Sequence, residues 1–286
     1  MLLPLATTAA TTSIALAATA SAPTAQIGAS DGTVRYGDKV RLSGAVPGVS
    51  GVEVEIAFQR DGSTAWRSVH RTSTDPAGSY EANVKPQASG SYRAQAAGGT
   101  PSQPVPVRVR SLTKLRIKRH VVVGDRVGIK GRVLPAGTGR RVRISLPGSD
   151  ERTKTRSGGR FKETWRPRST GRSRVRAIAE GDAVAAGSRS GARRVTVYRP
   201  ASASWYGPGL YGNRTACGQT LSPSTVGVAH KSMRCGTKLT LRYRGRSVNV
   251  RVIDRGPFVG GREFDLTGAT KNRLGFGSTG TVLSSR

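Results

Sequence analysis

Two carboxylates flank a glycine- and proline-rich loop near the C-terminus of this 286-residue chain, in the run VIDRGPFVGGREFDL of residues 252–266. Asp254 follows residues 248–253, where valines at every second position predict a β-strand. A carboxylic acid at the end of a strand, before a rigid turn, can present a proton donor or acceptor to a groove. Asp265 closes the same loop. An aspartate at such a place can also cap the turn, and the local sequence leaves both interpretations open.

The chain has two cysteines, Cys217 and Cys235, and three scattered histidines, His70, His120 and His230. Paired cysteines are expected in an exported protein, and this bridge would stabilise the fold by about 3 kcal/mol in the chain-entropy model. A zinc site would need two further ligands, and a cysteine nucleophile would have only His230 as a partner. We therefore predict a disulfide, with no metal and no cofactor.

The N-terminal segment favours export. Residues 2–22 are apolar or small throughout and contain Ala-x-Ala sites, which is typical of a signal peptide over residues 1–22. The segment departs from a standard signal because no basic residue precedes Arg35. Threonine and alanine dominate it, which argues against a membrane anchor. We predict a secreted or cell-wall-associated protein with no transmembrane helix in its mature form.

Basic charge is distributed unevenly along the chain, which carries 47 basic and 16 acidic residues. The net charge is +2 over residues 1–108, +19 over residues 109–200 and +10 over residues 201–286. Most of the basic residues are arginines, whose planar fork pairs with phosphate and carboxylate oxygens. We therefore predict that residues 110–199 bind anionic wall polymers. Nucleic acid is the disfavoured partner, because export separates the chain from the usual nucleic-acid targets.

Residues 24–199 contain one pattern twice. The copies share their turn and strand sequences: YGDKVRLSGAV (36–46) with VGDRVGIKGRV (123–133), and GSYEANVKP (78–86) with GRFKETWRP (159–167). Each copy holds six or seven short alternating strands, which predicts a small β-sandwich of immunoglobulin-like architecture. We place these sandwiches at residues 24–109 and 110–199.

The second copy carries closely spaced arginines, namely Arg140, Arg141, Arg143, Arg172, Arg174 and Arg176. Because alternate residues of a strand share one face, this spacing predicts a cationic stripe that could bind a polyanion. An ordinary solvated face would produce the same spacing. Neither copy offers a catalytic constellation, since Asp38 and Asp125 lie in Gly-Asp turns.

The remaining segment, residues 201–286, resembles the rare lipoprotein A (RlpA) family over about residues 202–283. The matching residues are Ser204-Trp205-Tyr206-Gly207, Thr215-Ala216 with Gly218, Ala229-His230-Lys231, Gly236-Thr237, Asp254-Arg255-Gly256-Pro257-Phe258 and Asp265-Leu266. The resemblance implies a six-stranded double-psi β-barrel that engages peptidoglycan, with lytic transglycosylase activity in some members. With the two sandwiches, the expected fold class is all-β.

The implied reaction breaks the β-1,4 bond after N-acetylmuramic acid while the muramyl 6-hydroxyl closes a 1,6-anhydro ring. One carboxyl group can suffice, because it can first protonate the departing oxygen and then accept the proton of the 6-hydroxyl. The resemblance assigns this role to Asp254. It also places His230 at the catalytic site, as a hydrogen-bonding partner of a sugar hydroxyl or of the carboxyl group. A partly buried structural histidine is the other interpretation.

Further residues are assigned to sugar binding: Gln219, Trp205, Tyr206, Arg255 and Asp265. The aromatic residues could form a stacking platform together with Tyr211, although barrel packing would explain some of them equally well. Asp265 could instead tie the Gly260-Gly261 loop to the barrel.

Gln219 is the main departure from the family pattern. Members with proven activity carry Glu at this position, and an amide cannot donate a proton as a general acid. Cys217 and Cys235 also depart from the pattern together, as expected for an added clamp between two loops. Similar Thr-Ala-Cys-Gly sequences occur in barwin-like and expansin-like barrels. The alternative function is therefore a non-catalytic polysaccharide-binding or wall-loosening protein.

Overall fold

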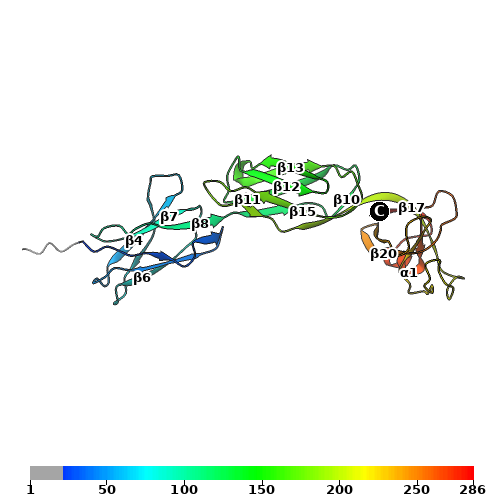
Figure 1. Ribbon diagram of the computed structural model, residues 1–286, viewed down its shortest axis with the longest axis horizontal. Coiled ribbons are helices and arrows are strands. Elements are labelled where there is room, and N and C mark those ends of the chain that lie inside the picture. The colour runs from blue at the N-terminus through cyan, green and yellow to red at the C-terminus, as the bar shows by residue number, and fades with distance from the viewer. Residues whose placement is uncertain (1–21) are drawn as a thin grey trace, which may run out of the picture. The chain divides into compact units, whose positions relative to one another are not determined.

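The computed structural model describes residues 22–286, so the predicted signal peptide lies outside the described residues except for Ala22. The chain divides into two compact units. The first comprises the residues up to Gly32 with 38–86 and 90–107, and the second comprises 33–37, 87–89 and 108–286. Strands dominate both units (Figure 1). In the described part of the chain, no helix has the length and apolar character needed to cross a bilayer.

Each of the two sequence repeats forms a β-sandwich. In the first, one sheet has the order β1 (Gly28–Ala29), β3 (Val40–Ala45), β6 (Ser79–Val84), and the other has the order β2 (Thr33–Arg35), β8 (Val105–Arg110), β7 (Gly90–Ala96), β4 (Glu53–Arg60), β5 (Arg67–Ser73). In the second, the corresponding sheets are β9 (Leu112–Arg116), β11 (Val127–Leu134), β14 (Arg160–Trp165), and β10 (His120–Val122), β17 (Arg193–Tyr206), β15 (Gly171–Ala179), β12 (Arg141–Leu146), β13 (Ser149–Lys154). The strand orders correspond one to one, which confirms the internal repeat.

Period-two alternation explains the second sandwich. Strand β11 buries Val127, Ile129 and Val133, while its intervening residues face outward. Phe161 of β14 packs across this strand at Gly131, where a Cβ atom would lie 2.0 Å from the ring. The remaining elements of this sandwich are the short strand β16 (Ser188–Arg189), which pairs with β15, and the 3-10 turn η1 (Ser157–Gly159).

Five members of the predicted arginine stripe leave the outer face of the sheet that contains β12 and β15, namely Arg141, Arg143, Arg172, Arg174 and Arg176, but Arg140 does not. Arg140 is 6% exposed, and its guanidinium donates to Asp182, to Ser111 and to the carbonyl oxygen of Pro135. The prediction was wrong for Arg140 because sequence spacing cannot distinguish an inward arginine with buried partners from an outward one. Two other members have carboxylate partners, since Arg141 pairs with Glu180 and Arg143 pairs with Asp150.

Strand β17 connects the second sandwich to the C-terminal barrel. Its first half pairs with β15, and its second half, from Arg199, pairs with barrel strands. The predicted domain boundary at residues 199–201 therefore falls inside a continuous strand. The second sandwich and the barrel share one compact unit as a result.

Six strands close the barrel. Around the ring their order is β17, β21 (Phe264–Thr267), β18 (Val228–His230), β20 (Arg246–Asp254), β19 (Lys238–Tyr243) and β22 (Gly280–Ser284), and β22 pairs with β17 again. Leu241, Phe264 and Leu266 are fully buried inside. The helix α1 (Gly268–Leu274) follows β21 directly. It begins there because Thr267 caps its first turn, and it ends at Gly275, which adopts the left-handed conformation.

Candidate active site

The barrel brings the two carboxylates of the Gly/Pro loop to one edge. Ala229 of β18 is the register partner of both Asp254 on β20 and Asp265 on β21. Two strand spacings separate the Cα atoms of the aspartates, or roughly 9.5 Å. Strand β20 carries one extra residue, Ile253, in this register, and such a bulge re-aims the side chain next to it. The site is thus assembled by neighbouring strand ends.

Asp254 is half-buried and held by backbone amides. Its Oδ1 accepts hydrogen bonds from the N–H of Ala216, at 2.8 Å, and of Arg255, at 2.9 Å. These two donors fix the carboxyl group at the rim while using only one of its oxygens. The carboxyl group can therefore meet a bound molecule through its other oxygen.

Arg255 does not neutralise Asp254. Its guanidinium points toward the loop of residues 230–235 and donates to the carbonyl oxygens of His230, at 3.3 Å, and Met233, at 2.9 Å. It also contacts the sulfur of Cys235 at 3.4 Å. Arg255 therefore braces the loop beside the site, and the neighbouring carboxylate is left without a cationic clamp.

His230 is buried beneath that loop and is not brought to the Asp254 carboxyl group. It follows Ala229 in β18, so its side chain leaves the opposite face of the strand. Its Nδ1 accepts the N–H groups of Ser232 and Met233, which places the proton of the neutral ring on Nε2, 3.8 Å from Glu263. Burial is the main cause that lowers the pKa of His230, and Glu263 opposes the shift.

Asp265 lies in a drier environment. The Ser204 hydroxyl donates to its Oδ1 at 2.6 Å. Burial raises the pKa of Asp265 most, Ser204 and Arg262 lower it, and the nearby Asp254 charge raises it further. Asp265 is therefore both a structural partner of β17 and a second carboxyl group close to the first.

Two buried hydroxyls near these carboxylates have no hydrogen-bond partner within residues 22–286, namely Tyr206 Oη and Thr215 Oγ1. Burial is the largest cause that raises the pKa of Tyr206, and Asp254 adds to it through its charge and through the closeness of its carboxyl group to the Tyr206 hydroxyl. Thr215 immediately precedes Ala216, whose amide holds Asp254. Unpaired buried polar atoms are costly, so these two hydroxyls mark a strained part of the site. The sequence predicted a sugar-binding role for Tyr206, whereas Thr215 stood out only as part of the Thr-Ala motif.

The loop that carries Gln219 also carries this amide. Residues 214–220 form a small hairpin in which Thr215 N–H donates to the carbonyl oxygen of Gln219. The predicted disulfide between Cys217 and Cys235 is present, with a Cα–Cα distance of 5.7 Å, and it ties this hairpin to the loop braced by Arg255. The Gln219 side chain is exposed on the hairpin.

The predicted aromatic platform is only partly formed. Trp205 packs against the barrel core, with the Lys271 ammonium 4.3 Å from its ring centre. The exposed aromatic residues near the site are instead Tyr211, 36% exposed, and Phe258, 85% exposed. Phe258 belongs to the loop that follows Asp254, so it is a candidate for stacking on a sugar ring that the sequence analysis did not single out.

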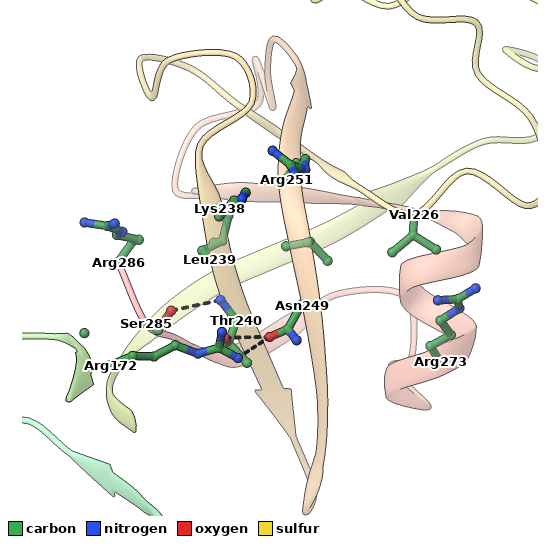
Figure 2. Close-up of a pocket in the computed structure, with 12 residues that line it drawn as sticks. Arg172, Val226, Lys238, Leu239, Thr240, Asn249, Arg251, Arg273, Ser285 and Arg286 are labelled. Atoms are coloured by element: carbon green, nitrogen blue, oxygen red, sulfur yellow. Dashed lines mark hydrogen bonds between the residues drawn. The ribbon is translucent and has the colours of Figure 1, made fainter. Parts of the chain in front are cut away.

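A hollow of about 790 Å³ lies elsewhere on the barrel, against β19 and β20 (Figure 2). Asn249 accepts hydrogen bonds there from Thr240 and from Arg172 of the second sandwich. The lining includes five cations, Arg172, Lys238, Arg251, Arg273 and Arg286, and no carboxylate. The side chains that line this hollow therefore offer no carboxyl group for acid–base chemistry. Within the described residues, no group of three His, Cys, Asp or Glu side chains could hold a metal ion.

The comparisons with known proteins concern this same barrel. Residues 199–283 match a family model described as lytic transglycolase. The probable endolytic peptidoglycan transglycosylase RlpA of Synechocystis is 45% identical over 80 residues, which cover 27% of this chain and 25% of that protein. The endolytic peptidoglycan transglycosylases RlpA of Campylobacter jejuni and Pseudomonas aeruginosa are 41% and 42% identical, over 28% of this chain and 30% and 24% of theirs.

The chain thus spans about a quarter to a third of the length of these relatives. The matched segment coincides with the closed six-stranded ring and with the motifs around Asp254. The C-terminal domain of this chain is therefore a double-psi β-barrel of the RlpA-like family.

Proposed function

We propose that this protein is exported to the cell wall, where its barrel binds peptidoglycan glycan strands and cleaves them as a lytic transglycosylase. The observation that carries the proposal is the Asp254 carboxyl group, half-buried at the barrel rim and held by two amides with no cation clamped to it. The names of the RlpA relatives support the same reaction class.

In the proposed reaction, protonated Asp254 donates its proton to the glycosidic oxygen as the C1–O bond breaks. The leaving strand departs with a free 4-hydroxyl group. The Asp254 carboxylate then accepts the proton of the muramyl 6-hydroxyl group. The oxygen of that hydroxyl group bonds to C1 and closes the 1,6-anhydro ring. The carboxyl group ends protonated, as it began, and no water molecule is consumed.

Other residues of the site would bind rather than transfer protons. The exposed ring of Phe258 supplies a stacking surface for a sugar ring, while the buried Tyr206 hydroxyl lies beside the Asp254 carboxyl group. The catalytic role assigned to His230 stays a prediction. Its contacts fit a positioning role, because it anchors the loop to which Arg255 binds.

The test is digestion of purified peptidoglycan by the full chain, with the soluble products identified by mass spectrometry. We expect 1,6-anhydromuropeptides from the wild-type protein and none from Asp254→Asn. The matched control is Asp150→Asn, which makes the same chemical change in the second sandwich and should retain activity. Anhydro products from Asp254→Asn at the wild-type rate would contradict the proposal.

Gln219 supports a second candidate, a polysaccharide-binding or wall-loosening protein without covalent chemistry. The hairpin beside Asp254 exposes an amide where active family members have a carboxyl group. If that group is required, the wild-type protein will sediment with peptidoglycan without releasing products. Gln219→Glu should then produce anhydromuropeptides, which distinguishes the two candidates.

A further inference from the structure

We propose that the outer face of the three-stranded sheet β9–β11–β14 binds a linear polyanion with repeated phosphate groups and no aromatic bases. The site is a set of six side chains, called here the cation grid. Its first row is Arg116, Lys130 and Lys162, and its second row is Lys114, Arg132 and Arg160. The inference does not depend on catalysis by the barrel.

The strand register builds the grid. Lys130 of β11 lies directly opposite Arg116 of β9 on one side and Lys162 of β14 on the other, and Arg132 lies opposite Lys114 and Arg160. Gly131 and its partners on the neighbouring strands lie between the two rows and face the interior of the sandwich. The six cations therefore leave the opposite face of the sheet, and all of them are exposed. The backbone positions that carry these side chains are about 4.8 Å apart across strands and roughly 6.7 Å apart along them.

This arrangement works against folding. Like charges directly opposite each other on neighbouring strands are destabilising, and the grid contains four such pairs, all of which involve Lys130 or Arg132. None of the six forms an ion pair with a carboxylate in the part of the chain that the structure describes. The missing negative charge would be supplied by a bound polyanion.

The first sandwich provides an internal comparison. Its sheet β1–β3–β6 has the same register, with Gly28, Ser43 and Glu81 in the positions of the first row. Ala45 and Ser79 stand where the second row has Arg132 and Arg160. The same fold thus forms without any of these cations, which indicates that the grid serves binding and not the architecture.

The shape and composition of the face indicate the ligand. The grid cations and Arg156 surround a shallow hollow of about 520 Å³. Within residues 110–199, no large hydrophobic or aromatic side chain is strongly exposed, so the face has no platform on which nucleic-acid bases could stack. Three of the six grid residues are lysines, which bind phosphate as point charges, and the three arginines can bind phosphate oxygens through their planar forks.

The test measures binding of the full chain to glycerol-phosphate oligomers at several salt concentrations. We expect the variant Lys130→Gln/Lys162→Gln to bind about tenfold more weakly. The plot of log K against log salt should become shallower, with the magnitude of its negative slope reduced by about 1.4, at about 0.7 per lost contact. The charge-matched control, Lys39→Gln/Lys154→Gln, should bind like the wild type. The melting temperature of the grid variant should equal or exceed that of the wild type, because two repulsive pairs are removed, Lys130 with Lys162 and Lys130 with Arg116.

Three outcomes would overturn the proposal. Equal weakening in the control variant would mean that net charge alone attracts the polymer. Loss of binding in Lys238→Gln/Arg251→Gln, with normal binding by the grid variant, would place the polymer in the hollow of Figure 2. Binding of single-stranded DNA or polyglutamate as tightly as the glycerol-phosphate oligomer would exclude the stated ligand class.

Discussion

At the residue scale, the chemistry of the site depends on where one guanidinium points. Arg255 follows Asp254 in sequence, yet it binds the carbonyl oxygens of His230 and Met233. Asp254 receives hydrogen bonds from the backbone N–H groups of Ala216 and Arg255, which orient the carboxyl group without clamping it to a cation. The backbone, and not the neighbouring guanidinium, therefore sets the position of the carboxyl group.

The hydroxyl of Tyr206 gives a prediction about stability. It is buried beside Asp254 and has no hydrogen-bond partner within the described residues, so Tyr206→Phe should raise the free energy of unfolding by about 1 kcal/mol. In the control, Tyr198→Phe removes a hydroxyl bonded to His120 at 2.9 Å and should destabilise by about 1 kcal/mol. Chemical denaturation measures both, and equal destabilisation by the two variants would show that the Tyr206 hydroxyl has a partner in the folded protein.

Asp265 gives a prediction about pH. Burial raises its pKa in the folded protein, so the folded state binds this proton more tightly than the unfolded chain does. Its contribution to stability is present below the unfolded pKa and is lost as the pH rises through the folded pKa. Asp265→Asn should therefore be more stable relative to the wild type at about pH 7 than at about pH 3. Urea denaturation at the two pH values would show no such difference if burial did not control this group.

At the element scale, two loops meet at Asp254 and one covalent bond joins them. The hairpin of residues 214–220 supplies the Ala216 amide, and the loop of residues 230–235 receives Arg255. The Cys217–Cys235 bridge connects them. The position of the carboxyl group therefore depends on these two loops and on the bond that joins them.

Removing the bridge should affect both stability and the site. Cys217→Ser/Cys235→Ser should lower the free energy of unfolding by about 3 kcal/mol. Binding of glycan should weaken as well, because the Ala216 amide is no longer held beside Asp254. The chain has no other cysteine, so a reducing agent applied to the wild type should reproduce the effect. Full binding by the reduced protein would show that the hairpin is positioned without the bridge.

At the scale of the whole molecule, charge and architecture are distributed separately. The two sandwiches share a strand order, yet residues 1–108 carry a net charge of +2 and residues 109–200 carry +19. Self-repulsion should therefore destabilise the second unit much more than the first.

Salt should reveal this asymmetry in calorimetry. Between about 50 and about 500 mM salt, the Debye length falls about threefold. The transition of the second sandwich and barrel should move up by a few degrees, while that of the first unit should change little. Shifts of equal size in both transitions would show that the charge of residues 109–200 is already compensated in the folded state.

The sequence predicted much of this architecture because local patterns carry it. Alternating strands and repeated turns identified the two sandwiches, and the motifs around Asp254 and Asp265 identified the barrel family. The disulfide followed from the number of cysteines. These features depend on residues close in sequence or on motifs preserved as units.

What the sequence by itself determined was therefore the all-β fold class, the internal repeat, the barrel family and the carboxylate proposed for catalysis. Only the tertiary structure decided the directions of side chains: Arg255 away from Asp254, His230 toward Glu263, Arg140 into the second sandwich, and six cations onto one face of β9, β11 and β14. The physical reason is register. A shift of one residue between paired strands reverses which side chains meet, and pairing between distant strands is not encoded in any single segment.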